Sequence, residues 1–281
     1  MNSFFSPLRY PGGKRKLYGF FSQLIKVNNL DKGVYAEPFA GGAGLALKLL
    51  FKGDVGHIFI NDIDKSLHAF WESVLNHTAD LCELINVTPV NMEIWYLQQS
   101  IQMNPGEAST LELGFSTFYL NRTNRSGILK GGVIGGKDQA GSYKLDARYN
   151  KPDLVSRIMA IAKRKSQISV SRLEGTEFIQ SLMQRQIPKL LLYLDPPYYV
   201  KGKALYENHF IKDDHLLLSQ IVNAISGNWI VTYDNVPEIR ELFSSSRFLE
   251  YSINYTAQEK TLGSEIMFIS DGLSVEGLAL V

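Results

Sequence analysis

A carboxylate, two prolines and a tyrosine follow an apolar run of the sequence, as Asp195-Pro196-Pro197-Tyr198. The two prolines remove two backbone donors and fix two φ angles, which presents the Asp195 carboxylate and the Pro196 carbonyl side by side as acceptors. Two adjacent acceptors match the two hydrogens of a planar exocyclic NH₂ group, and Tyr198 offers a ring on which a base can stack. The alternative is a turn that proline merely stiffens. We interpret the segment as a site for an aromatic amine.

Two earlier segments could hold a ligand near this site. The stretch from Glu37 through Pro38, Phe39 and Ala40 to Gly44 contains glycines that allow a backbone to approach a ligand closely. Asp62 lies eighteen residues beyond Gly44 and ends an apolar run, where a carboxylate binds the ribose diol in nucleoside cofactor sites. The alternatives are a glycine loop without a ligand and a solvent-facing Asp in an Asn-Asp turn.

The elements around these residues are typical of a parallel sheet. Gly33 to Glu37 and His57 to Asn61 have strand character, and Leu45 to Phe51 and Lys65 to Leu75 have helical character. A strand, glycine turn, helix and strand in this order predict a βαβ unit. Ligands of open α/β sheets bind beyond the carboxyl ends of the strands, and all three candidate segments follow such ends.

The α/β pattern stops near Asn76 and resumes near residue 166. The intervening stretch contains helical patches around a Gly-rich loop, Gly127 to Gly141; the patches are Met92 to Met103, Thr110 to Leu120 and Leu154 to Lys165. The later part predicts strands over 167–171, 189–194 and 229–233, helices over 177–184 and 213–225, and a hairpin within 248–270. We therefore predict a Rossmann-like, doubly wound α/β domain built from 1–75 and 166–281, interrupted by a mostly helical insertion, 76–165.

The charge is unevenly distributed along the chain. The formal net charge is only +1, but Asn121 to Lys165 contains eleven Lys and Arg and three Asp, a local charge of +8 that leaves −7 elsewhere. Such asymmetry indicates a surface for a polyanion on an otherwise acidic protein. The alternative is a solvated loop with scattered basic residues.

Several classes of protein are excluded by composition. Hydrophobic residues make up 45% and charged residues 20% of the chain, as in ordinary globular proteins. No apolar run is long enough for a membrane span, and Met1 to Lys14 lacks the apolar stretch of a signal peptide. A single cysteine, Cys82, excludes an intrachain disulfide and favours a reducing compartment. No metal site is expected, and we predict a cytoplasmic protein without a membrane partner.

In their order along the chain, these motifs resemble the amino-group DNA methyltransferases that use S-adenosylmethionine, and most closely the Dam-type N6-adenine enzymes. The resemblance covers nearly the whole chain. It rests on five segments, which are Arg9-Tyr10-Pro11-Gly12-Gly13-Lys14, Glu37 to Gly44, Phe118 to Arg122, Arg148 to Pro152, and Asp195 to Tyr198. The sequence departs from Dam at Thr123 to Ser126 and in the following glycine-rich loop, so the GATC target of Dam is not carried over.

The resemblance implies a pocket for S-adenosylmethionine. Lys14 would supply a cation for the methionine carboxylate. The alternative is a surface lysine before a helix, which we would favour if Gly12 and Gly13 did not precede it. Asp62 would accept from the ribose or the amino group, and the rings of Tyr10 and Phe39 would pack on the flat or sulfonium parts. The implied cofactor residues are Tyr10, Lys14, Glu37, Pro38, Phe39, Gly41, Gly42, Gly44, Asp62 and Asp195.

The resemblance also implies the reaction and its catalytic residues, Asp195, Pro196, Pro197 and Tyr198. The target base would be flipped out of duplex DNA, stacked on Tyr198 and held by the acceptor pair during in-line attack on the methyl group. The sulfonium is already an activated methyl donor, so neither a covalent nucleophile from the protein nor a metal is required. The acceptor pair itself does not distinguish adenine N6 from cytosine N4. The resemblance favours N6-methyladenine.

The basic insertion is expected to bind the DNA through phosphate and base-edge contacts. The expected contact residues are Arg122, Asn124, Arg125, Lys130, Lys137 and Arg148. For Arg122, an internal salt bridge that orders the loop is the alternative. The other functions considered are a methyltransferase of this fold that acts on RNA or a protein amide, and a non-catalytic DNA-binding regulator. The enzyme would be bacterial or phage-encoded, and either an orphan or paired with a restriction endonuclease.

Overall fold

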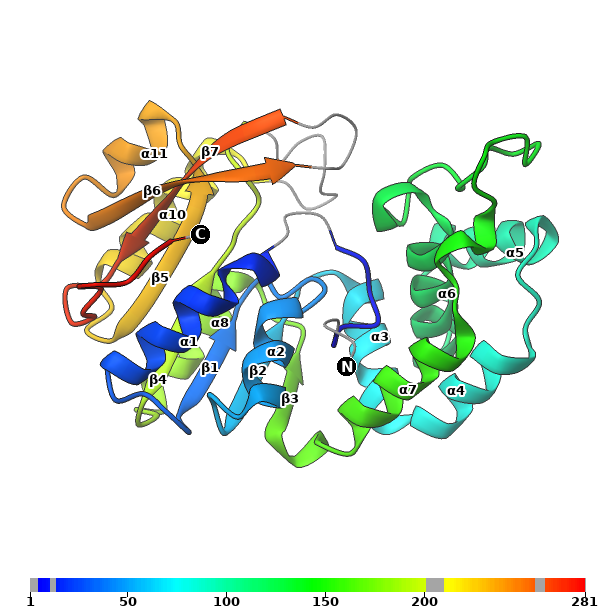
Figure 1. Ribbon diagram of the computed structural model, residues 1–281, viewed down its shortest axis with the longest axis horizontal. Coiled ribbons are helices and arrows are strands. Elements are labelled where there is room, and N and C mark those ends of the chain that lie inside the picture. Colours follow the sequence, from blue (N-terminus) through cyan, green and yellow to red (C-terminus); the bar gives the residue numbers. More distant parts are fainter. Residues whose placement is uncertain (1–4, 11–13, 201–209, 256–260, 281) are drawn as a thin grey trace. The chain divides into compact units, whose positions relative to one another are not determined.

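The computed structural model describes residues 5–10, 14–200, 210–255 and 261–280 (Figure 1). The chain forms two compact units. The first, called here the helical unit, comprises Met1–Pro11 and Asp64–Arg172, and the second, the sheet unit, comprises Gly12–Ile63 and Leu173–Val281. Pro11, Gly12 and Gly13 of the N-terminal motif lie outside the described residues.

A mixed β-sheet has the strand order β3-β2-β1-β4-β5-β7-β6. In the sheet unit, β1 pairs in parallel with β2 and β4, β4 pairs in parallel with β5, and β7 lies antiparallel between β5 and β6. The strands are β1 (Val34–Glu37), β2 (His57–Asn61), β3 (Ile168–Ser171), β4 (Leu190–Leu194), β5 (Asn228–Asp234), β6 (Arg247–Tyr255) and β7 (Thr261–Ile269).

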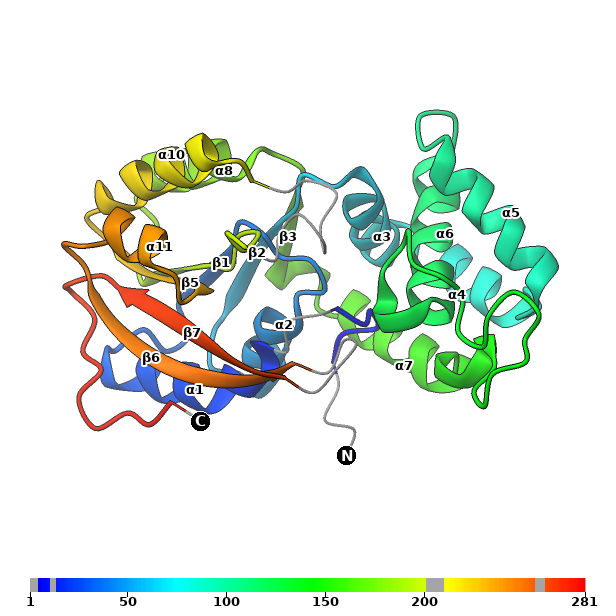
Figure 2. The same cartoon turned by 90° about the horizontal axis from the view of Figure 1, so that it is seen from above.

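Helices cover both faces of the sheet, which is why its central strands are apolar on both sides. All five residues of β4 are buried, as a strand in a doubly covered parallel sheet must be. In Figure 2, α1 and α2 lie on one face, and α8, α10 and α11 lie on the other. The helices of this unit are η1 (Lys14–Leu17), α1 (Tyr18–Val27), α2 (Gly44–Lys52), α8 (Gly175–Gln184), α10 (Lys212–Asn223) and α11 (Pro237–Leu242). The predicted doubly wound α/β fold is confirmed.

In the helical unit, α6 packs against α3, α4 and α5. Almost every residue of α6 from Leu113 to Thr123 is buried, so its hydroxyl and amide groups need partners inside the protein. Ser116 Oγ, for example, donates to the carbonyl of Gln98 at 2.8 Å. The helices are α3 (Lys65–Asn76), α4 (Thr78–Val87), α5 (Met92–Met103), α6 (Thr110–Thr123), α7 (Lys151–Ala162), η2 (Arg125–Gly127), η3 (Leu145–Arg148) and η4 (Lys165–Gln167).

Some predicted boundaries differ from those in the structure. Helix α7 begins three residues earlier than predicted because Asn150 caps it, accepting from the Asp153 amide at 3.1 Å, with Pro152 in the first turn. Helix α4 was not predicted. The helical unit begins at Asp64 rather than residue 76, since α3 packs on α6. The catalytic and target-recognition roles of the two units stay predictions.

Candidate active site

The Asp-Pro-Pro-Tyr segment, Asp195 to Tyr198, begins directly after β4 and has neither helical nor strand structure. Pro196 and Tyr198 are buried, and Pro197 is half-buried. The Asp195 side chain is 23% exposed, so its carboxylate can be reached from solvent. The predicted strand end and the predicted carboxylate therefore lie together at the carboxyl edge of the sheet.

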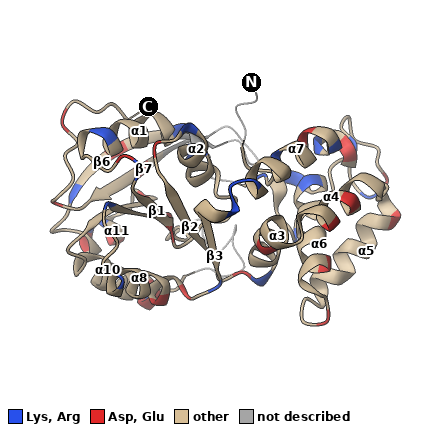
Figure 3. Cartoon of the chain, turned by 90° about the horizontal axis from the view of Figure 1, so that it is seen from below, with Lys and Arg blue, Asp and Glu red and all other residues tan. Residues whose placement is uncertain are grey.

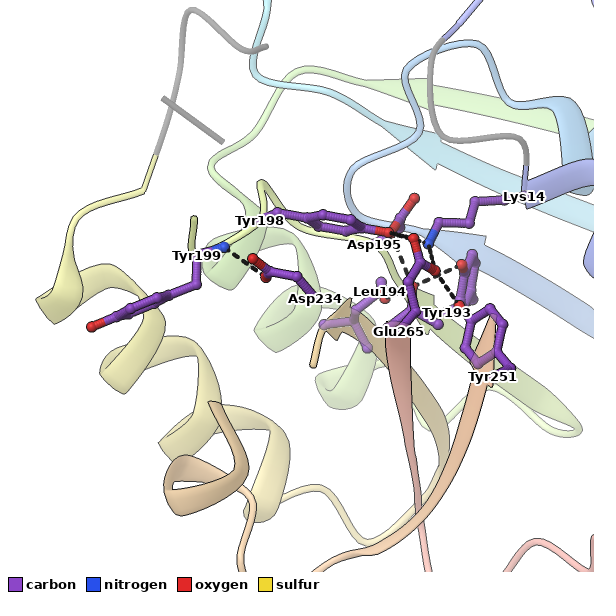
Figure 4. Close-up of polar contacts among 10 residues, drawn as sticks. Lys14, Tyr193, Leu194, Asp195, Tyr198, Tyr199, Asp234, Tyr251 and Glu265 are labelled. Atoms are coloured by element: carbon purple, nitrogen blue, oxygen red, sulfur yellow. Dashed lines mark hydrogen bonds and ion pairs between the residues drawn. The ribbon is translucent and has the colours of Figure 1, made fainter. Parts of the chain in front are cut away.

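Lys14 contacts this segment through its ammonium group (Figure 4). Its Nζ lies 3.1 Å from Asp195 Oδ1, 2.8 Å from Glu265 Oε2 and 2.5 Å from the Tyr198 hydroxyl. An ammonium group has three N–H donors, and these three acceptors use all of them. In this structure the charge of Lys14 lies between two of the protein's own carboxylates, and its predicted role as a cation for a ligand carboxylate stays a prediction.

Glu265 lies on β7 with a fully buried side chain. Its Oε1 accepts from the Tyr198 hydroxyl, and its Oε2 accepts from Lys14 and, at 2.5 Å, from the Tyr251 hydroxyl. We call Lys14, Asp195, Tyr198, Tyr251 and Glu265 the carboxylate cluster. It contains two carboxylates and one ammonium group, so an excess negative charge is held at the edge of the sheet.

One oxygen of Asp195 is held by the protein and the other is available. Oδ1 accepts from Lys14 and, at 2.9 Å, from Thr232 Oγ1, which lies 2.9 Å from the Tyr193 hydroxyl. Within the described ranges, no donor is bonded to Asp195 Oδ2 or to the Pro196 carbonyl. Two unoccupied acceptors on adjacent residues are what a primary aromatic amine requires.

The ionisation of the cluster follows from burial and mutual charge. Burial raises the pKa of Asp195, Lys14 opposes this, and Glu265 adds to it. Burial disfavours the charged form of Lys14, but Asp195 and Glu265 outweigh it, so the pKa of Lys14 is raised. Burial likewise opposes ionisation of Glu265, but chiefly Lys14 holds its pKa below the usual value. Lys14 and Glu265 are therefore both charged at neutral pH.

Asp234, at the end of β5, holds the chain that follows Tyr198. Its Oδ1 accepts from the Tyr199 amide at 2.9 Å (Figure 4). Its Oδ2 accepts from the Val200 amide, also at 2.9 Å. A carboxylate that bridges two successive amides restricts the backbone there. The orientation of the Asp-Pro-Pro-Tyr segment thus depends on β5 as well as on its own prolines.

The loop between β1 and α2 has an unusual backbone. Gly41 and Ala43 both have left-handed conformations, with φ of 47° and 46°, which glycine adopts freely and alanine rarely. The Gly41 amide donates to Asp62 Oδ2 at 2.9 Å, and the Pro38 carbonyl accepts from Asn61 Nδ2 at 2.9 Å. The ends of β1 and β2 are therefore tied together.

Glu37, at the end of β1, is buried below this loop. Its Oε1 accepts from the Tyr35 hydroxyl at 3.0 Å and from the Ala46 amide at 3.2 Å. Burial raises the pKa of Glu37 to about 8, with a smaller contribution from the charge of Asp195. A carboxyl group of this kind gains a favourable partner when a cation comes near.

These residues fit a flat ligand that carries hydroxyl and amino groups. A side-chain atom added at Gly44 would meet nothing within 4 Å, so the loop borders open space. The ring of Phe39 packs so closely on α8 that a Cβ at Gly175 would lie 2.5 Å from it. Half-buried Asp62 can accept from hydroxyl groups, and Glu37 can receive a cation. Gly41 and Gly42 are buried, whereas Tyr10 is 39% exposed and belongs to the helical unit.

In the helical unit, Arg122 and Asn124 face inward. Arg122 Nε donates to the Arg148 carbonyl at 2.7 Å, and burial chiefly lowers its pKa to about 10. Asn124 is 0% exposed, accepts from Trp95 Nε1 at 2.7 Å and donates to the carbonyls of Ile128 and Leu129. The predicted DNA contact of Asn124 is therefore corrected to a role in ordering the loop. For Arg122 the structure favours the internal alternative, through carbonyl groups rather than a salt bridge.

The other predicted DNA contacts lie on the surface of the helical unit. These exposed residues are Arg125, Lys130, Lys137 and Arg148. The Arg148 guanidinium lies 5.8 Å from the ring centroid of Tyr143, whose side chain is 67% exposed. Figure 3 shows residues of both signs on α7, where Arg157 pairs with Asp153 one turn away. Their part in DNA binding stays a prediction.

Sequence reasoning missed four residues of the site: Thr232, Asp234, Tyr251 and Glu265. Asp234 carries the same signal as Asp62 and Asp195, a carboxylate directly after an apolar strand, and could have been found in that way. Tyr251 and Glu265 could not, because they meet only through the register of β6 against β7, which pairs them directly.

Comparison with known proteins gives one match to a family. A family model described as D12 class N6 adenine-specific DNA methyltransferase matches residues 10–259. No curated protein matches the chain. Among solved structures, a candidate RNA methyltransferase from Pyrococcus horikoshii is 11% identical with a TM-score of 0.45, over 94% of this chain and 85% of that one. A SAM-dependent methyltransferase from Agrobacterium tumefaciens is 9% identical with a TM-score of 0.42, over 91% and 62%.

Proposed function

The chain belongs to the D12 class of N6 adenine-specific DNA methyltransferases, so it transfers a methyl group from S-adenosylmethionine to N6 of adenine in DNA, and we propose which of its residues do this. The catalytic residues in this proposal are Asp195, Pro196, Pro197 and Tyr198. The observation that carries it is the pair of unoccupied acceptors, Asp195 Oδ2 and the Pro196 carbonyl, beside a buried aromatic ring.

The acceptor pair would hold the amine of a flipped adenine. Each oxygen accepts one N–H, which draws the nitrogen out of conjugation with the ring and exposes its lone pair. The ring of Tyr198 supports the base, and flipping costs a few kcal/mol. When N6 bonds to the methyl carbon, the bond from that carbon to the sulfonium sulfur would break and leave a neutral thioether. The nitrogen must then lose a proton, and Asp195 Oδ2 is placed to accept it. The raised pKa of Asp195 makes it a stronger base than an exposed aspartate.

The cofactor would bind between the ends of β1 and β2. S-adenosylmethionine supplies an electrophilic methyl group on its sulfonium when it is bound. In this proposal Asp62 accepts from the ribose, Phe39 packs on a flat part of the cofactor, and Glu37 stabilises its positive charge. Gly44 leaves open space for it, and the buried Gly41 and Gly42 shape the same loop. Positioning of the reactants alone can contribute roughly 7–11 kcal/mol to lowering the barrier.

The substrate in this proposal is a short, specific site in duplex DNA. Arg125, Lys130, Lys137 and Arg148 are exposed on one unit and would contact phosphates or base edges. A cognate restriction endonuclease acting on the same site is the proposed partner, unless the enzyme is an orphan. If the enzyme is an orphan, the organism that encodes it has no endonuclease that cleaves the methylated sequence.

The test is to express the chain in a host without DNA methylation and to analyse the nucleosides of the host DNA by mass spectrometry. The proposal expects N6-methyladenine confined to one short sequence, and none with Asp195→Ala. Incubation of the purified protein with tritiated cofactor and either duplex DNA, RNA or protein then compares the substrates. N4-methylcytosine as the sole product, or transfer only to RNA or protein, would overturn the proposal.

A further inference from the structure

Glu265 is far from the Asp-Pro-Pro-Tyr segment in sequence, yet it contacts Tyr198 of that segment directly and Asp195 through Lys14. Its carboxylate accepts from the Tyr198 hydroxyl and from Lys14, and Lys14 in turn lies 3.1 Å from Asp195 Oδ1. The side chain of Glu265 is fully buried and comes from β7, a different strand from the β4 that carries Asp195. Glu265 is thus a buried group on β7 that can hold Tyr198 and Lys14 in place.

The Glu265 side chain is itself held by Tyr251, the residue opposite it on β6. Tyr251 on β6 is paired with Glu265 in the antiparallel register and donates to Oε2 at 2.5 Å. Both oxygens of Glu265 are therefore bonded, one to Tyr198 and one shared by Lys14 and Tyr251. A carboxylate held from both sides has one orientation, and it passes this orientation to its donors.

We propose that Glu265 is a positioning residue for methyl transfer, which holds the Tyr198 hydroxyl and the Lys14 ammonium so that the Tyr198 ring and Asp195 Oδ1 keep one orientation. The inference rests on the proposed function of the Asp-Pro-Pro-Tyr segment. With Oδ1 held by Lys14 and Thr232, Oδ2 remains directed away from these donors and open to the amine.

Charge distinguishes this role from a purely structural one. The cluster holds two carboxylates against one ammonium group, and the Glu265 carboxylate is fully buried, so its unbalanced charge costs stability. Replacing Glu265 by glutamine removes that charge and keeps the shape of the side chain, but it puts an N–H donor where one carboxylate oxygen accepts. If Glu265 served stability alone, a folded glutamine variant would keep the wild-type rate. If it orients reacting groups, glutamine lowers the rate although the fold is kept.

The first experiment compares Glu265→Gln with Glu250→Gln, a matched change on the adjacent strand β6. Glu250 precedes Tyr251 in the chain, but its side chain is exposed and contacts Arg240, at 2.6 Å, and Asn235. For Glu265→Gln we expect a single-turnover rate on duplex DNA about 100-fold lower, with little change in KM for DNA, in a variant that still folds. For Glu250→Gln we expect the wild-type rate. Equal rates in the two variants would overturn the inference.

The second experiment asks whether Glu265 acts through its neighbours. The charged groups that influence Asp195 are Lys14, Glu265 and Glu37. Loss of the Glu265 charge removes an effect that raises the pKa of Asp195, so the acidic limb of the rate profile should move to lower pH. In a Tyr198→Phe background the loss caused by Glu265→Gln should be smaller than in the wild type. The proposed role would be contradicted if the acidic limb did not move and if Glu265→Gln lowered the rate by the same factor in the wild type and in the Tyr198→Phe background.

The variant Tyr251→Phe keeps the test decisive if Glu265→Gln does not fold. It removes one donor to Glu265 and keeps the carboxylate with Lys14 and Tyr198, so we expect a smaller loss of rate than for Glu265→Gln. An unchanged rate in a folded Tyr251→Phe protein would then overturn the inference. A wild-type protein that methylates no adenine would instead refute the proposed function, so the two failures can be told apart.

Discussion

The carboxylate cluster of the sheet unit and the loop after α6 in the helical unit use polar residues differently. In the cluster, and among the residues that the structure describes, Lys14 bonds to charged or ionisable side chains. At the end of α6 and in the loop after it, Arg122 and Asn124 bond mainly to backbone carbonyls. Ion pairs respond to pH and to the loss of a charge, whereas bonds to carbonyls fix the path of the chain. Mutations should therefore affect activity in the first region and stability in the second.

The largest effect is expected for Asp195→Ala in the cluster. Loss of the acceptor and base should lower methyl transfer by about 10²–10⁴-fold, while stability changes little because the side chain is partly exposed at a strand end. Transfer of tritium from the labelled cofactor to duplex DNA measures it. Asp271→Ala, at an exposed aspartate, is the control and should retain activity. Near-normal turnover of Asp195→Ala would show that the catalytic assignment is wrong.

In the loop, Asn124→Ala should act on stability instead. The change leaves Trp95 Nε1 and two carbonyls without their partner, and a buried unsatisfied group costs about 1–3 kcal/mol. We expect the free energy of unfolding in urea to fall by roughly 3 kcal/mol. Asn86→Ala, at an exposed position, should change it little. If both variants are equally stable, the contrast between the two regions does not hold.

The buried carboxyl group of Glu37 should make the stability of the sheet unit depend on pH. Its pKa in the folded protein is about 8 against an ordinary 4.5, so the folded state binds a proton that the unfolded state releases. Its contribution to stability is complete below pH 4.5 and is lost as the pH rises to about 8. Glu37→Gln should therefore gain stability relative to the wild type over this interval. Urea unfolding at several pH values measures the difference, and a constant difference would refute it.

The smallest effect is expected on the surface of the helical unit. Arg125→Ala should weaken binding to duplex DNA and lower the salt slope of log K by roughly 0.9, with the cofactor affinity unchanged. Arg122→Ala should mainly lower stability, since its guanidinium bonds to the Arg148 carbonyl. Fluorescence anisotropy at several salt concentrations measures the slope. An unchanged slope for Arg125→Ala would place the recognition surface elsewhere.

Local patterns in the sequence predicted the strand ends and their carboxylates. Glu37, Asp62 and Asp195 each follow an apolar run, and a run of that kind is a local property of the chain. Glu265 could not be assigned in this way, because its function depends on a β6–β7 register and on a lysine 251 residues away. The burial of Asn124 could not be predicted for a similar reason, because it depends on Trp95, which lies on another helix.

The position of β7 between β5 and β6 has a consequence for biosynthesis. Strand β7 leaves the ribosome after the other strands of the sheet and must insert beside β5, and only then does Glu265 meet Lys14, which precedes it by 251 residues. Contacts so distant in sequence form late because the intervening chain must first be ordered. A nascent chain that contains Asp195 but not yet Glu265 therefore lacks part of its cluster, and the enzyme should remain inactive until Glu265 has been added and β7 has joined the sheet.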